Sequence, residues 1–214
     1  MRITKFGHSC LLIEEGGAII LVDPGSYSTG QDEAQGIDAI LITHEHQHHL
    51  SLDSLKKVIA NNPDAKIFTQ SAVGKLLDDA SIPYTRLEDG GQAEVKGVSI
   101  RGIGTDHAII HDSIPVVRNT GYLVANKFFY PGDMFTVPKE PVDILALPVS
   151  APWMRVGEAI DYARAVKARV SFPVHDGMLR EPGFMHGLVQ KVLASFGISF
   201  VPLQAGGVIE DGAV

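Results

Sequence analysis

The sequence contains a single cysteine, Cys10, so it cannot form an internal disulfide bond, and this fits a reducing compartment. It also lacks an apolar run of the ~20 residues needed to cross a bilayer. The N-terminal segment MRITKFGHSC has none of the successive charged, apolar and cleavage regions of a signal peptide. We therefore expect a cytoplasmic protein without a membrane partner, in which Cys10 is a small core residue.

Basic clusters are also missing from the sequence. Lys and Arg number 18 against 25 Asp and Glu, which gives a net charge of -7. Most nucleic-acid affinity comes from neutralising phosphates with a basic surface, so we expect no nucleic-acid partner. A small-molecule substrate is expected instead, and the sequence leaves a homo-oligomer open.

The 214 residues, 45% of them apolar, are sufficient for one folded domain spanning residues 1–214. Short apolar runs separated by Gly, Asp and Pro turns predict strands at residues 2–6, 10–14, 18–22 and 37–43. Helical spacing of apolar residues predicts helices at 51–62 and 71–80.

The second half alternates in the same way. Two hairpin-like stretches are expected to be antiparallel, 92–95 with 98–104 around Lys96-Gly97, and 120–125 with 127–130 around Asn126-Lys127. Strand, helix and strand patterns follow, at 142–149, around 159–166, at 168–174 and at 187–196, and the runs 198–203 and 206–210 are expected to close the sheet. This order predicts an α/β (α+β) fold, a four-layer αββα sandwich.

The strongest functional signal is the segment Thr43-His44-Glu45-His46-Gln47-His48-His49, which has four histidines in six residues. Imidazole is a preferred ligand of zinc and similar metals. If His44 and His46 extend from the end of a strand, they share one side of the backbone, and the following turn directs His48 and His49 to the other side. A histidine-rich surface loop is the alternative, but it would need neither the apolar strand before the segment nor the helix after it.

Four other possible ligands each follow an apolar run: Asp23, His107, Asp133 and His175. Strand ends converge at one edge of a sheet, so these side chains can meet in one cleft. Taken singly, Asp23 and Asp133 are also typical of turns, because each adjoins a Pro-Gly pair. Together with the histidine cluster, they favour a metal site.

The order of these residues resembles that of the metallo-β-lactamase superfamily over nearly the whole chain. Its pattern is an Asp after an early strand, H-x-H-x-D-H, a lone His, a lone Asp and a final His. GHSCLLIE, PGDMF, LALPV and FPVHDG resemble the branch that includes the ascorbate-6-phosphate lactonase type. The resemblance implies a metal-dependent hydrolase with one or two divalent ions. Zinc is the first expectation, with manganese or iron as alternatives.

By position, the resemblance implies two ligand groups that share a bridging Asp133: His44, His46 and His107 for one ion, and His49 and His175 for the other. Asp23 would orient the ligands by hydrogen bonds instead of binding metal itself.

One position departs from the family pattern, because His48 stands where the family has the Asp of H-x-H-x-D-H. A histidine can supply a ligand nitrogen there, but it brings no negative charge. If two ions bind, the site is one unit more positive, which favours anionic ligands. Asp106, Asp112 and Asp176 flank proposed ligands and are candidates to replace the missing carboxylate, although turn or supporting roles are the preferred interpretation.

Three further residues are candidates for substrate binding. His8 lies in a tight segment that similar proteins place near the pocket, and a purely structural hydrogen bond is the equal alternative. Trp153 could form a wall of the cleft and Arg155 could pair with an anionic group, the alternative being a packed loop with an exposed arginine. We expect His111 in an exposed loop and His186 on a surface helix.

The sequence thus predicts hydrolysis of a small, anionic ester or lactone by a metal-activated water, with His48 and Asp133 among the catalytic residues. Phosphodiester cleavage on the same fold is one alternative. A metal- or ligand-binding module without turnover is the other, and His48 is its support.

Overall fold

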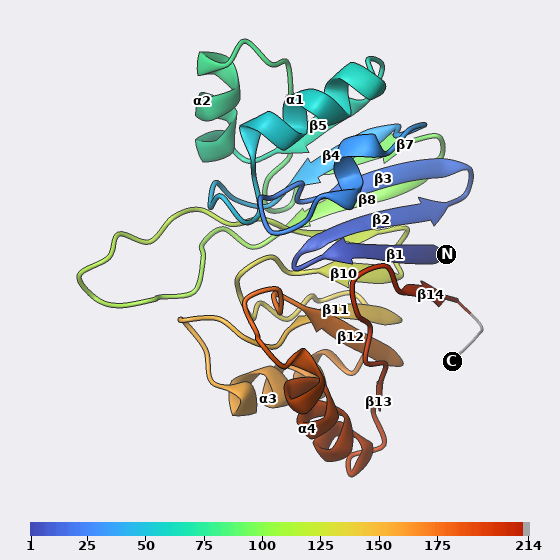
Figure 1. The fold of residues 1–214 in the computed structure, drawn as a ribbon, viewed down its shortest axis with the longest axis vertical. Helices are drawn as coiled ribbons and strands as arrows, with labels where there is room; N and C mark the ends of the chain where they lie inside the picture. The colour runs from blue at the N-terminus through green and yellow to red at the C-terminus, as the bar shows by residue number, and fades with distance from the viewer. Residues whose placement is uncertain (212–214) are drawn as a thin grey trace.

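Two β-sheets pack face to face, and helices cover the outer face of each, in the computed structural model, which describes residues 1–211 (Figure 1). The first sheet has, in order, β14 (Val208–Glu210), β1 (Arg2–Gly7), β2 (Cys10–Glu15), β3 (Ala18–Val22), β4 (Ala39–Ile42), β5 (Lys66–Thr69) and β6 (Thr85–Arg86). The second has, in order, β13 (Ser199–Phe200), β12 (Val170–Val174), β11 (Ile144–Pro148), β10 (Phe128–Tyr130), β9 (Gly121–Val124), β8 (Val98–Ile103) and β7 (Gln92–Val95).

Both central sheets are apolar on both faces because each lies between two other layers. In β3, Ile20 and Val22 belong to the core between the sheets, whereas Leu21 packs in the core under the helices. Cys10 is buried in that outer core and forms no disulfide, as expected from the sequence. The four-layer αββα prediction is confirmed.

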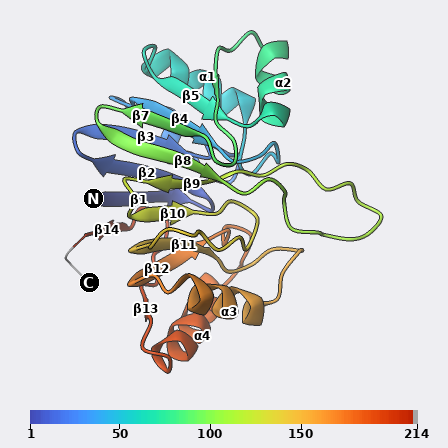
Figure 2. The same ribbon diagram turned by 180° about the vertical axis from the view of Figure 1, so that it is seen from behind.

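The helices form one pair on each outer face, α1 (Leu52–Asn61) with α2 (Ser71–Asp79), and α3 (Val156–Val166) with α4 (Pro182–Ala194) (Figures 1 and 2). The side chain of Ser51 caps α1 by accepting a hydrogen bond from the amide of Ser54. Among residues 1–211, no helix is long and apolar enough to span a bilayer.

Three sequence expectations needed correction. Helix α4 begins at Pro182, five residues before the predicted start at residue 187, because proline is well suited to the first position of a helix. The last two strands do not close one sheet, since β13 and β14 lie at the edges of different sheets. Strand β5 was not predicted, and its four residues include only two with large apolar side chains.

Parallel pairing brings the functional segments together. Strands β3, β4 and β5 are parallel, as are β10, β11 and β12. The segments after β3, β4, β10 and β12 carry predicted site residues: Asp23, the four histidines of residues 44–49, Asp133 and His175. The loop from residue 104 to 120, which contains His107, projects from the same edge of the molecule (Figures 1 and 2).

Candidate metal centre

The histidine-rich loop after β4 turns back on itself directly after His46. The amides of His49 and Leu50 both donate to the carbonyl of His46, at 2.8 and 2.9 Å. Nε2 of His44 lies 3.0 Å from Nδ1 of His46, so these two rings present their nitrogens to a common point. His44 and His49 are buried and His48 is partly exposed.

Asp133 lies at the middle of the predicted ligands. Its Oδ1 is 3.2 Å from Nε2 of His49. Its Oδ2 has four imidazole nitrogens around it, at 3.1 Å (His175), 3.3 Å (His107), 3.8 Å (His48) and 3.9 Å (His44), each measured to Nε2. A carboxylate in this position can bridge two ions, the role that the resemblance implies for it.

The donor set fits one or two metal ions. His49 Nε2, His107 Nε2 and Asp133 Oδ1 are buried without a hydrogen-bond partner, and such orphaned atoms are costly unless an ion or another ligand satisfies them. Ligand atoms within 4.8 Å of one another form three groups. Two contain Asp133: His44, His46, His107 and Asp133, and His44, His48, His49 and Asp133. The third joins His48, His49 and His175 to His8. The nitrogen-rich set is typical of zinc and other borderline metals.

The opposite ring nitrogens are held by the protein. Nδ1 of His107 lies 2.5 Å from the carbonyl oxygen of Ala108, and Nδ1 of His175 lies 2.6 Å from that of Ser150. A carbonyl only accepts, so Nδ1 carries the proton and Nε2 keeps its lone pair for a metal.

Asp23 holds two imidazole rings of the loop after β4, that of His49 directly and that of His44 through Thr43. One carboxylate oxygen, Oδ2, lies 2.6 Å from Nδ1 of His49 and 2.8 Å from the hydroxyls of Thr43 and Tyr130. The Thr43 hydroxyl in turn lies 2.9 Å from Nδ1 of His44. The prediction that Asp23 orients the imidazoles therefore agrees with its contacts.

The pKa shifts in the centre favour a negative charge on Asp133 and a positive charge beside it. Burial would lower the pKa of His49, but Asp133 and Asp23 on its two sides raise it to about 10, which favours a positive charge at this position. Burial would raise the pKa of Asp133, but His49 and His175 hold it well below its usual value. Burial, followed by the neighbouring His107, lowers the pKa of His46 to about 4, which keeps this ligand neutral.

Three site residues have left-handed backbone conformations: His8 (φ 39°), Asp23 (φ 46°) and His175 (φ 60°). This conformation is unfavourable for residues with a Cβ atom and persists where the surrounding structure holds it, often at functional sites. Each of the three directly follows the end of a strand, β1, β3 or β12. The strain thus accompanies the sharp turns that direct these side chains into the centre.

A cavity of about 340 Å³ opens over this centre. His46, His48, His107, Asp133 and His175 line it together with Tyr27, Gln47, Ile110, Pro152, Trp153 and Met178. Nε1 of Trp153 donates to Oδ2 of Asp133 at 3.2 Å, so this residue forms a wall of the cavity. Arg155 does not line it, because Arg155 is exposed at the start of α3, where its amide bonds to the carboxylate of Glu158.

The other residues that the sequence analysis singled out differ in burial and in distance from the centre. His8 is buried beside the centre, whereas Asp106, His111 and Asp112 are exposed in the projecting loop. His186 does lie on a helix, but the expectation that it faces the surface was wrong: it is buried, and its Nε2 lies 2.9 Å from Oδ2 of Asp176. The same carboxylate oxygen lies 2.6 Å from Nζ of buried Lys5, so Asp176 does not replace the missing carboxylate of the centre.

Sequence reasoning missed three residues that support the site. Lys5 lies on the same face of β1 as buried Ile3, and it is itself buried although lysine is a residue type that usually faces solvent. Tyr130 is the last residue of an apolar strand, with no signal for its contact with Asp23. Asn119 accepts from the amide of Asp133 and donates to the carbonyl of Pro131, which fixes the turn before the bridging carboxylate.

Comparison with known proteins assigns the family. Residues 2–175 match the β-lactamase superfamily domain. The Mycobacterium tuberculosis protein Rv0786c is 38% identical to this chain, over 84% of this chain and 85% of the length of Rv0786c. The UPF0173 metal-dependent hydrolase TV0864 of Thermoplasma volcanium is 25% identical, over 82% of this chain and 83% of the length of TV0864. The solved structure of Igni18, a metallo hydrolase from Ignicoccus hospitalis, has the same fold, with a TM-score of 0.77 at 21% identity and 97% coverage of both chains. The chain therefore belongs to the β-lactamase superfamily and is a metal-dependent hydrolase of the metallo-β-lactamase fold.

Proposed function

We propose that this hydrolase acts on a small ester or lactone that carries an anionic group, with zinc as its metal and a cytoplasmic small molecule as its substrate. The observation that carries the proposal is the Asp133-centred cluster of histidines at the floor of a cavity of about 340 Å³. A cavity of this volume lies within the usual range of small-ligand pockets.

The metal ligands would be the residues gathered around Asp133: His44, His46, His48, His49, His107 and His175. When bound, divalent ions supply Lewis acidity and activate water near neutral pH. The chain itself orients the imidazoles through Asp23 and the loop carbonyls. It also limits the access of bulk water, because Trp153, Met178 and Ile110 place apolar surface beside the ligands.

The preference for an anion follows from the charge of the centre. Among residues 1–211, Asp133 is the one carboxylate in the candidate ligand groups, so two divalent ions would leave a net positive charge. No Lys or Arg lines the cavity, and Arg155 lies outside it. The attraction for an anionic group would thus come from the ions, and we no longer propose Arg155 as its partner.

Steady-state kinetics of zinc-loaded protein tests this proposal. We expect the highest kcat/KM for a phosphorylated lactone, lower values for its neutral counterpart, and the lowest for a bis-aryl phosphodiester. Preference for the diester would move the protein to the phosphodiesterase class. Tight metal binding without turnover on an ester, lactone and diester panel would instead favour a binding module. His46→Ala is the control for metal-dependent turnover.

A further inference from the structure

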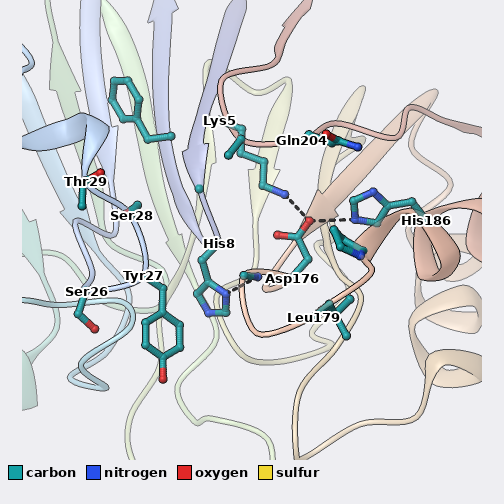
Figure 3. A pocket seen from close by; sticks show the side chains of 15 residues that line it. Lys5, His8, Ser26, Tyr27, Ser28, Thr29, Asp176, Leu179, His186 and Gln204 are labelled. Atoms are coloured by element: carbon teal, nitrogen blue, oxygen red, sulfur yellow. Dashed lines mark hydrogen bonds and ion pairs between the residues drawn. The ribbon is translucent and has the colours of Figure 1, made fainter.

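His8 lies outside the predicted ligand set but directly against it. Its ring centroid is 4.3 Å from that of His175, 5.2 Å from His48 and 6.0 Å from His49. A ring nitrogen of each of these four histidines lies within 4.8 Å of the others. His8 also lines a second cavity, of about 600 Å³, together with Lys5 and Asp176 (Figure 3). It therefore stands between this second cavity and the metal centre.

Two hydrogen bonds fix His8 in place. Its carbonyl accepts from the amide of His175 at 3.0 Å, and its Nδ1 accepts from the amide of Gly177 at 3.0 Å (Figure 3). The close approach depends on glycine, because a Cβ at position 177 would lie 2.9 Å from Cβ of His8. The ring consequently has little freedom to turn.

The bond from Gly177 determines which nitrogen of His8 carries the proton. A backbone amide only donates, so Nδ1 must present a lone pair, and the neutral ring must then carry its proton on Nε2. This is the reverse of the arrangement in His107 and His175, whose Nδ1 atoms face carbonyl oxygens. A ring with its proton on Nε2 has no lone pair there for a metal.

Nε2 of His8 is buried and has no hydrogen-bond partner. A buried N–H without an acceptor is unfavourable, and native proteins seldom leave one unsatisfied. The ring packs against Tyr27 and against the imidazoles of His48, His49 and His175. Since a ring nitrogen of His8 lies within 4.8 Å of one in each of these three histidines, we assign the missing acceptor to that half of the centre. An oxygen atom bound there, from substrate or water, would satisfy it.

We propose that His8 is a hydrogen-bond donor, through Nε2–H, to an oxygen atom bound at the half of the centre formed by His48, His49 and His175, and that it is not a metal ligand. This assignment rests on the metal centre of the proposed function. It separates His8 by its chemistry from the histidines that are candidate metal ligands.

The loop that supplies the Gly177 amide is anchored by a buried ion pair. Oδ2 of Asp176 accepts from Nζ of Lys5 at 2.6 Å and lies 2.9 Å from Nε2 of His186 (Figure 3). Nζ of Lys5 also donates to the carbonyls of Pro173 and Leu203, at 2.9 and 3.2 Å. The three groups hold residues 173–177 against β1, the strand that ends just before His8.

Nitrogen-detected NMR of the zinc-loaded protein with labelled histidine tests the tautomer directly. We expect His8 to show a bare Nδ1 and a protonated Nε2, and the ligand rings His107 and His175 to show the opposite pattern. A proton on Nδ1 of His8, or a metal-bound Nε2, would overturn the proposal.

Variants test the donor role with inorganic phosphate as the probe. His8→Phe should keep the zinc content of the wild type but bind phosphate about tenfold or more weakly, the order expected when a hydrogen bond to a charged acceptor is lost. His8→Gln, whose amide can place an N–H near the position of Nε2, should recover much of the affinity. His111→Gln, in the exposed loop, is the matched control and should bind phosphate normally.

Two results would contradict the donor role: zinc loss in His8→Phe, which would make His8 a ligand, or unchanged phosphate affinity in that variant. The proposed function can fail separately. If the protein turns over no ester, lactone or diester but His8 has the expected tautomer and phosphate response, only the reaction is wrong.

Discussion

His48 is the residue that distinguishes this centre from the family pattern. Its Nε2 lies 3.2 Å from Nε2 of His175 and 3.8 Å from Oδ2 of Asp133, which places it where a ligand of the second ion is needed. None of the three carboxylates that flank the ligands in the sequence compensates for the missing charge, because Asp106 and Asp112 are exposed and Asp176 pairs with Lys5. A second ion at this place would therefore be held by imidazoles and a single carboxylate.

Replacing His48 with Asp tests this point. Unit charges 4 Å apart attract by about 4 kcal/mol at an effective dielectric constant of 20, so a carboxylate should raise the affinity for the second ion by more than about tenfold. Zinc titration of wild type and His48→Asp measures the change. Equal second-site affinity in the two proteins would show that imidazole is a full replacement.

Among the structural elements, the turn after β3 decides how closely the Asp23 segment approaches the histidine loop. A Cβ at Gly25 would lie 1.9 Å from the carbonyl oxygen of His48 and 2.7 Å from the amide nitrogen of His49. The amide of Ser26 also donates to the carbonyl of Gln47 at 2.9 Å. The two loops are thus joined backbone to backbone.

Gly25→Ala should therefore displace the backbone of His48 and His49, weaken zinc binding, and cost roughly 1–3 kcal/mol of unfolding free energy, as overpacking does. Gly157→Ala is the matched control, because a Cβ there meets nothing within 4 Å and alanine favours the helix. Zinc titration and thermal unfolding of both variants check the prediction. Normal zinc affinity in Gly25→Ala would mean that the contact is not needed for the centre.

The elements also show what the sequence could and could not predict. Strand ends followed by Asp or His predicted which residues gather around Asp133, because parallel strands bring such positions to one edge. The Lys5–Asp176–His186 contacts could not be predicted, since Lys5 and Asp176 are 171 residues apart and each looks like an ordinary surface residue in its own segment. The start of α4 was also missed, because Pro182 and Gly183 interrupt the apolar pattern there.

At the scale of the whole molecule, the centre joins the two sheets. His44, His46, His48 and His49 follow a strand of the first sheet, and His107, Asp133 and His175 follow strands of the second. Metal bound by both sets would cross-link the two halves of the sandwich. A metal ion that binds only the folded state would also shift the folding equilibrium towards that state by mass action.

Removal of metal should consequently lower the melting temperature. At a free zinc concentration 1,000 times Kd, the binding contributes about 4 kcal/mol. For a domain of this size, that corresponds to a shift on the order of 10 °C. Calorimetry with and without a chelator measures it, and His46→Ala, already deficient in metal, should respond much less. A chelator effect of the same size in both proteins would exclude this explanation.

Anomalous diffraction from crystals of the zinc-loaded protein would show whether the residues around Asp133 hold the metal. We expect anomalous peaks within the cluster, one among His44, His46 and His107 and a second among His48, His49 and His175, with Asp133 between them. Peaks elsewhere in the molecule, or no peak within the cluster at saturating zinc, would contradict it.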